Sequence, residues 1–135
     1  GSSASLVGLR VGPGQEEEGG AGLIEVEAAA RKLAMHVVAA RPRYLAPHVV
    51  PPHHLTHERD ILRDQAAPLG KPEHIIEKMV EGRLKKFMNE FCLLEQAHML
   101  EEDSPKISKF LSGLSKRLKR DIELTSFVRF GVGEE

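Results

Sequence analysis

The sequence is poor in cysteine and in aromatic residues, and neither sign of charge dominates. Its 135 residues include one cysteine and no tryptophan, and 19 basic residues stand against 20 acidic ones. The single Cys92 excludes an intramolecular disulfide framework and any multi-cysteine zinc site. A net charge of -1 gives no general attraction to nucleic acid or anionic lipid, so binding to either would need a local patch.

Long apolar runs are also missing. No stretch reaches the roughly 18 apolar residues of a membrane span. The first residues have neither the basic start nor the apolar stretch of a signal peptide. We therefore expect neither a membrane protein nor a secreted one. The composition, 41% apolar and 29% charged, predicts a soluble chain of one domain, with or without a smaller appendage.

The residues that are present predict two strands and four helices. The aliphatic run 6–11 ends at a Gly-Pro-Gly turn, which is typical of a strand. The run 122–130 alternates, and we expect Ile122, Leu124, Val128 and Phe130 to share one face of a second strand. Apolar residues at helical spacing predict helices over residues 26–40, 53–67, 72–91 and about 105–118.

The segments between these elements have weaker patterns. Residues 15–22 are rich in Glu and Gly and are predicted to be a mobile loop. Residues 47–52 are predicted to be an extended, proline-containing connector. Residues 93–100 are apolar without helical period, so a strand or an extended segment is expected there. Ser104 and Pro105 are predicted to begin the last helix as N-cap and first residue.

These elements predict an α+β fold. A small antiparallel sheet is expected to be covered by the first and fourth helices. The second and third helices are expected to form an antiparallel hairpin, because only a few helix-breaking residues connect the two. This hairpin is inserted between the first and the fourth helix. A sheet of two or three strands is marginally stable alone, which suggests that the chain is part of something larger.

No motif in the chain predicts an active site. Gly12 and Gly14 follow a strand, but the glutamates after them would repel a phosphate, so no phosphate-binding loop is expected. His53, His54 and His57 form the best metal candidate, with Glu58 as a further oxygen ligand. Their position at the start of a helix after two prolines disfavours a specific site, and we predict no metal and no cofactor.

Three more features allow a functional and a structural interpretation. Cys92 ends an apolar stripe and is predicted to be a buried packing thiol and not a nucleophile. His36, beside another apolar stripe, is predicted to be half-buried with one hydrogen bond. The sequence has one basic cluster, and it predicts either an ordinary solvated face or a contact to RNA or the ribosome. Its residues are Lys116, Arg117, Lys119 and Arg120.

Four stretches in order carry a resemblance to a known family. They are residues 33–40 (LAMHVVAA), 70–87 (GKPEHIIEKMVEGRLKKF), 92–96 (CLLEQ) and 126–134 (SFVRFGVGE). The second closely resembles the second helix of the coiled-coil hairpin of elongation factor Ts, and residues 4–11 resemble the strand that precedes the others. The match covers about residues 29–135.

The resemblance implies a nucleotide-exchange factor without bond-making chemistry, whose partner is elongation factor Tu. It implies a C-terminal core subdomain made of residues 1–47 and 93–135, and an inserted hairpin of residues 48–92 that serves dimerisation or projects outward. Leu6, Leu9 and Arg10 are the predicted partner-binding residues. The helix around 33–40 and the strand 127–130 are expected to form the core of the subdomain. The predicted hairpin packing positions are Ile76, Val80, Leu84 and Phe87.

The departures from the family matter equally. No residues match the family's N-terminal helical module or its Thr-Asp-Phe-Val motif, so a fragment or a shortened form is expected, binding without full exchange activity. The alternative is a ribosome-associated structural protein that kept the scaffold and lost exchange. The family implies a bacterial cytoplasm or a mitochondrial or plastid matrix.

Overall fold

The computed structural model describes residues 2–14 and 21–132. It contains two strands and four α-helices in the described residues, and three short 3₁₀ helices join them. In chain order the strands and helices are β1 (Ser3–Val11), α1 (Ala21–Ala40), α2 (Pro52–Ala66), α3 (Glu73–Phe91), α4 (Ile107–Leu118) and β2 (Ile122–Gly131). The 3₁₀ helices are η2 (Pro47–Val49), η3 (Ala67–Leu69) and η4 (Leu93–Glu95).

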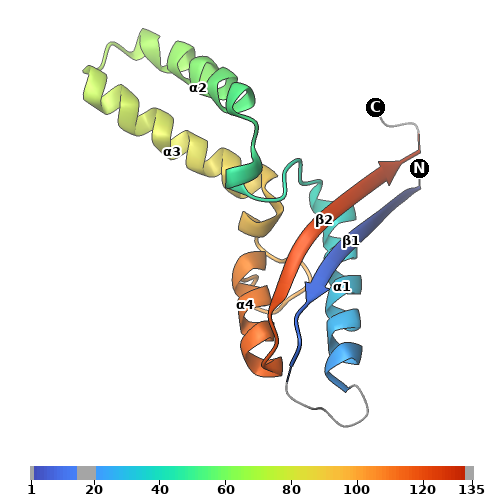
Figure 1. Ribbon diagram of the computed structural model, residues 1–135. Coiled ribbons are helices and arrows are strands. Elements are labelled where there is room, and N and C mark those ends of the chain that lie inside the picture. The colour runs from blue at the N-terminus through green and yellow to red at the C-terminus, as the bar shows by residue number, and fades with distance from the viewer. Residues whose placement is uncertain (1, 15–20, 133–135) are drawn as a thin grey trace.

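The arrangement confirms the predicted α+β fold. The antiparallel strands β1 and β2 lie across α1 and α4, and α2 and α3 form a hairpin that projects away from them (Figure 1). Helix α1 begins at Ala21, five residues before the predicted start. Of the segment predicted to be a mobile loop, residues 15–20 lie outside the described residues, whereas Gly22 is helical.

A break in the strand register reverses which face the second half of β2 presents. Gly8 pairs with Ser126 and the next residue, Leu9, pairs with Leu124, so Thr125 is an extra residue in β2. Such a bulge shifts the alternation of side chains by one residue. Phe127 therefore packs against the core, and Val128 and Phe130 are exposed. The prediction that Val128 and Phe130 share a face with Ile122 and Leu124, and belong to the core, is wrong for this reason.

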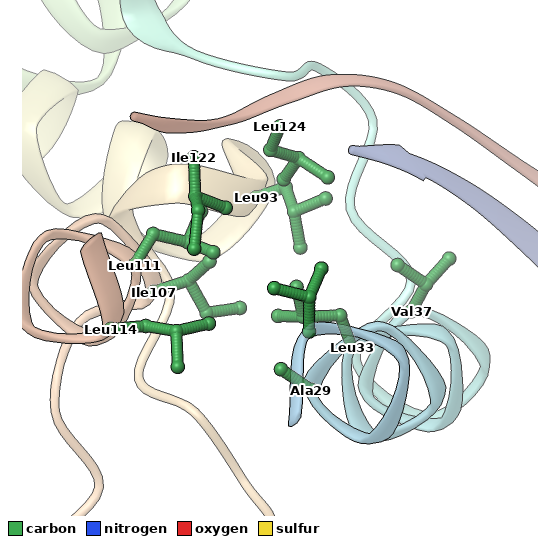
Figure 2. Packing of buried hydrophobic residues seen from close by; sticks show 10 residues of the cluster. Ala29, Leu33, Val37, Leu93, Ile107, Leu111, Leu114, Ile122 and Leu124 are labelled. Carbon is green, nitrogen blue, oxygen red and sulfur yellow. The ribbon is translucent and has the colours of Figure 1, made fainter. Parts of the chain in front are cut away.

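The main core lies between α1, α4 and the sheet. Figure 2 shows aliphatic side chains from α1, α4, β2 and η4 pointing toward one another. Leu33 and Val37 of α1 are completely buried, as are Leu93 and Ile107. Burying a leucine or isoleucine in this way contributes about 1.5–3 kcal/mol. Because most of this core is aliphatic, the chain needs few aromatic residues there.

The segment after α3 is a 3₁₀ turn and not a strand. The N–H groups of Leu93 and Leu94 donate to the carbonyl oxygens of Tyr44 and Leu45 at 2.8 and 3.0 Å. These bonds hold η4 against the segment after α1, so that Leu93 enters the core. The prediction of a strand or an extended segment is therefore wrong for residues 93–95, whereas Gln96 after them is extended. Met99 and Leu100 at the end of the run are exposed.

Two predicted helix starts are also corrected. Residues 47–49 form η2 and α2 begins at Pro52, so the connector is shorter and less extended than predicted. Helix α4 begins at Ile107 with Lys106 at the N-cap. Ser104 instead lies in a turn with φ 45°, and its N–H donates to the Glu101 carbonyl oxygen at 3.1 Å.

The hairpin has its own small apolar cluster. Ala66 of α2 and Ile76, Val80 and Leu84 of α3 are buried together, with Leu55 and Leu62 partly buried beside them. Gly70 closes the connection between the helices with a φ of 65°, which suits glycine because it has no Cβ.

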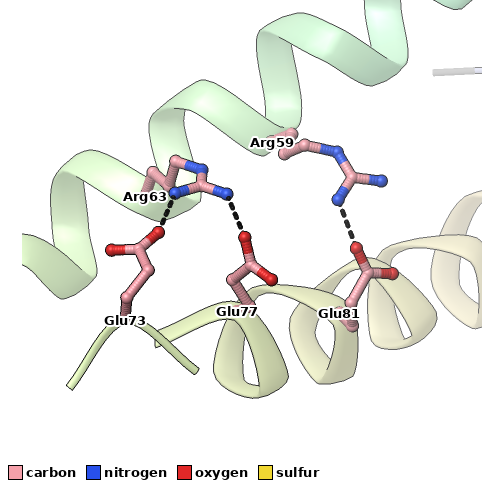
Figure 3. A network of polar contacts seen from close by, with 5 residues as sticks. All are labelled: Arg59, Arg63, Glu73, Glu77 and Glu81. Carbon is pink, nitrogen blue, oxygen red and sulfur yellow. Dashed lines mark hydrogen bonds and ion pairs between the residues drawn. The ribbon is translucent and has the colours of Figure 1, made fainter. Parts of the chain in front are cut away.

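Ion pairs line one edge of the hairpin. Arg63 of α2 lies 2.7 Å from Glu73 and 3.1 Å from Glu77 of α3, and Arg59 pairs with Glu81 (Figure 3). Their side chains are at least 39% exposed, so water screens these pairs and each contributes little to stability. The apolar cluster therefore supplies most of the hairpin's stability.

Candidate functional site

The outer face of the sheet, away from the core, carries exposed apolar side chains. Leu6 of β1 lies opposite Val128 of β2, and Ala4 lies opposite Phe130. Leu6, Val128 and Phe130 are 68%, 44% and 59% exposed, and we call these three residues the outer sheet patch. Covering neighbouring apolar groups with a partner removes them from water, which is favourable for binding. This patch therefore has the character of a protein-binding surface.

The predicted partner-binding residues divide between the two faces of β1. Leu6 belongs to the outer sheet patch, and Arg10 is exposed beside Glu123, with 2.6 Å between Nη2 and Oε2. Leu9 instead packs against the core. Sequence reasoning missed Val128 and Phe130 as surface residues because the extra Thr125 that turns them outward leaves no mark in the hydrophobic pattern.

The predicted hairpin packing residues occupy two places. Ile76, Val80 and Leu84 lie in the cluster between α2 and α3. Phe87 is half-buried nearer the core, and the centre of its ring lies 6.3 Å from that of Tyr44 and 5.0 Å from that of Phe91. Phe87 thus packs where the hairpin joins the core, apart from the other three.

The basic cluster is less uniform than its sequence suggests. Lys116 and Lys119 are exposed. Arg117 forms an ion pair with Glu25 of α1. Arg120 is half-buried and lies across Gly14, where an added Cβ would come within 2.5 Å of the arginine Cγ. The expectation that all four side chains point outward is therefore wrong for Arg120.

The histidines at the start of α2 do not form a metal site. Among the described residues, no group of three or more His, Cys, Asp or Glu side chains is placed to hold a metal ion. His54 instead shares a hydrogen bond of 2.9 Å with the Tyr44 hydroxyl through Nδ1. The three histidines line a shallow pocket beside Tyr44.

Two histidines elsewhere are buried more deeply than the sequence predicted. His36 and His98 are 1% and 0% exposed, and their rings meet edge to face with centres 5.5 Å apart. The Met99 N–H donates to Nδ1 of His36 at 3.2 Å, so Nε2 carries the proton and donates to Gln96 Oε1 at 2.9 Å. Burial lowers the pKa of both histidines. His36 is thus a fully buried residue with two hydrogen bonds and not the half-buried one predicted.

His98 is fixed in a similar way. The Leu100 N–H donates to its Nδ1 at 3.2 Å, and its ring meets Phe110 edge to face at 4.8 Å. Because a backbone N–H points at Nδ1 in each ring, neither histidine can add a proton there without breaking a hydrogen bond. The pair therefore has a packing role in its neutral form.

Cys92 is a buried thiol, as predicted. It is 0% exposed, and burial raises its pKa to about 11. A thiol with this pKa carries almost no thiolate at neutral pH, and the thiolate is the nucleophilic form. Cys92 therefore has a packing role.

The described helices include none long and apolar enough to cross a membrane. Among the features described above, the outer sheet patch has the clearest binding character, because its apolar side chains are exposed. An exposed apolar surface of this kind is a candidate for contact with another protein.

Comparison with known proteins agrees with this interpretation. The chain is similar to the Elongation factor Ts of Rhodospirillum rubrum, with 49% identity over 104 residues, or 77% of this chain and 33% of that protein. It is 44% identical to that of Desulfitobacterium hafniense over 105 residues, or 78% of this chain and 48% of that protein. The Elongation factor Ts of Syntrophotalea carbinolica is 37% identical over 129 residues, or 96% of this chain and 40% of that protein.

The chain thus spans between a third and a half of the length of these relatives. A family model described as "Elongation factor TS" matches residues 11–134, which include all four helices and the whole of β2. The match runs through both the core and the hairpin, and the chain belongs to the elongation factor Ts family.

Proposed function

We propose that this chain binds elongation factor Tu and takes part in the exchange of GDP for GTP, with no bond-making chemistry and no cofactor of its own. Family membership supports this proposal. The observation that carries it is the outer sheet patch. Its apolar side chains are exposed, because no other part of the described residues covers them. We propose that this patch and Arg10 contact the partner, whereas Leu9 supports the strand from the core side.

We propose that the chain has two parts with separate tasks. Residues 1–47 and 93–135 would form the core subdomain that binds the partner, and residues 48–92 a hairpin that contacts a second copy or the rest of a longer chain. Two clusters of buried residues that share no member support this division. Ile76, Val80 and Leu84 would hold the hairpin together, and Phe87 would fix its base.

We propose that this chain alone binds without stimulating full exchange, since it spans no more than about half of the length of the relatives named above. The site of action would be wherever bacterial-type translation takes place, which is a bacterial cytoplasm or the matrix of a mitochondrion or plastid. The relatives named above are bacterial proteins.

The binding proposal can be tested with a double variant, Leu6→Ser with Phe130→Ser. Binding to GDP-loaded elongation factor Tu is measured by calorimetry, and exchange by release of a fluorescent GDP. Loss of the two apolar contacts should weaken binding at least about tenfold, which corresponds to a combined loss of about 1.4 kcal/mol. Met35→Ser is the matched control, since Met35 is 60% exposed on α1.

Equal binding by the double variant and the wild type would refute the patch as the contact surface. Strong stimulation of GDP release by this chain alone would refute the view that it binds without full exchange.

Lys116 and Lys119 support a second candidate, a structural protein of the ribosome that lost exchange. Both are exposed near the end of α4, where cations are favoured by the helix dipole. Co-sedimentation with ribosomes should then weaken as salt is raised and be reduced in Lys116→Glu with Lys119→Glu. The control is Lys78→Glu on α3, and absence of co-sedimentation at every salt concentration would exclude this candidate.

A further inference from the structure

A pocket of about 370 Å³ lies where the hairpin joins the core. Its walls come from three segments that are distant in the sequence: the residues after α1, the first turns of α2 and the end of α3. The residues that matter most are Arg43, Tyr44, His53, His54, His57 and Phe87. Its volume is in the lower range for small-molecule sites and has room for one base with its sugar.

The walls of the pocket are mostly planar rings that hold one another in place. The ring centres of Tyr44 and His54 are 5.9 Å apart, and those of Tyr44 and Phe87 are 6.3 Å apart. The hydrogen bond between the Tyr44 hydroxyl and His54 fixes two of the rings. His53 meets His54 edge to face at 4.3 Å. Rings of Phe, Tyr and His are the side chains on which unpaired bases stack.

The charges around the pocket suit an anion at one end. Arg43 is exposed, and its guanidinium carbon lies 5.5 Å from the Tyr44 ring centre and 5.3 Å from that of Phe91. The first turn of α2 contains no acidic residue that would repel an anion. Glu58 lies one turn further along the lining, where its carboxylate can accept a hydrogen bond from an amino group.

From this combination we propose that the pocket binds a nucleoside 5′-phosphate unit. The base stacks on the rings of Tyr44 and Phe87, and the phosphate lies toward Arg43 and the start of α2. The unit comes either from a free mononucleotide or from an unpaired nucleotide of an RNA strand. The outer sheet patch shares no residue with this pocket. This proposal and the proposed binding of elongation factor Tu can therefore be refuted independently of each other.

The test follows the histidine ring signals of the whole chain by NMR during titration. The probes are AMP, adenosine, inorganic phosphate and a single-stranded RNA tetranucleotide. AMP should shift the signals of His53, His54 and His57 and leave that of His74, which lies outside the pocket on α3, unchanged. AMP should bind more tightly than adenosine or phosphate alone. Tighter binding of the tetranucleotide than of AMP identifies an RNA strand as the source, and equal or weaker binding identifies a free nucleotide.

Two variants separate the base from the phosphate. Tyr44→Leu should weaken AMP binding about 5- to 150-fold, which is the range for one base stack. Arg43→Gln should abolish the preference for AMP over adenosine, whereas the matched control Arg83→Gln, outside the pocket, should retain it. Because Arg43 is exposed, its variant tests the proposal even if Tyr44→Leu fails to fold.

Three results would overturn the proposal. One is no shift of the three histidine signals with AMP or with the tetranucleotide at millimolar concentration. Another is binding of phosphate as tight as that of AMP, because then no base is recognised. The third is an unchanged affinity for AMP in both pocket variants.

Discussion

Substituting Leu84 by alanine should destabilise the hairpin and leave the core intact. Leu84 is 5% exposed and packs with Val80, Ile76 and Ala66. The change removes three carbons, and at about 0.8 kcal/mol per buried methylene the transfer cost is about 2.4 kcal/mol. The cavity left behind raises the total, up to about 5 kcal/mol, so the transfer cost is the lower limit. Since the cluster of Leu84 has no residue in common with the main core, this loss should fall on α2 and α3.

Amide hydrogen exchange under native conditions measures the effect residue by residue. A loss of about 2.4 kcal/mol corresponds to a rate increase of about 50-fold for the protected amides of α2 and α3. Amides of α1 and β2 should exchange at the wild-type rate. Leu33→Ala, at a completely buried position of the main core, should instead speed exchange in α1, α4 and the strands. Met35→Ala, at an exposed position of α1, should change neither.

The reasoning is refuted if Leu84→Ala speeds exchange equally in the hairpin and in α1. That result would mean that the two clusters unfold as one cooperative unit. An increase below about fivefold in the hairpin would mean that the site collapses around the smaller side chain, or that Leu84 packs less closely than its burial indicates.

Acid, alkylation and loss of an ion pair probe three other features. Burial lowers the pKa of His36 and His98 below 6.5, so the unfolded chain binds these protons at a higher pH than the folded chain. The temperature of the unfolding midpoint should therefore decrease as the pH is lowered from about 7 to about 5. A midpoint that stays level or rises over this range would contradict this. Cys92 should react slowly with iodoacetamide at pH 8 when folded and rapidly in denaturant, and equal rates would show that its burial is not maintained. Arg63→Ala should leave the urea midpoint of unfolding almost unchanged, since its ion pairs are exposed. A clear fall in this midpoint would give these pairs a structural role that their exposure argues against.

Much of the fold could be predicted because helices and strands leave periodic patterns. The stripe Ile76, Val80, Leu84 predicted both the third helix and the face that it buries. The end of α1 at Ala40 was predicted from the proline at position 42. One error lies in a segment without a period, residues 93–95, where Leu93 is buried by a 3₁₀ turn and not by a strand. Another lies in β2, where the period is clear but a bulge reverses it.

The candidate surfaces were predicted less well than the helices. The exposure of a side chain depends on which other residues cover it. Ion pairs and contacts between residues distant in the sequence are not visible in a local pattern. Arg117 meets Glu25 across 92 residues of sequence, and His36 meets Gln96 across 60. The pocket beside Tyr44 likewise joins three segments that only the packing of the hairpin base brings together.

The sequence by itself determined the class of fold, the helical hairpin and, through four ordered stretches, the family. These properties follow from local periodicity and residue identity, which are independent of register. The tertiary structure decided which side chains of β2 face the solvent. One extra residue, Thr125, reverses the alternation after Leu124, and this turns Phe127 inward and Val128 and Phe130 outward. A bulge is defined by the pairing of two strands more than 100 residues apart, so only the assembled sheet contains it.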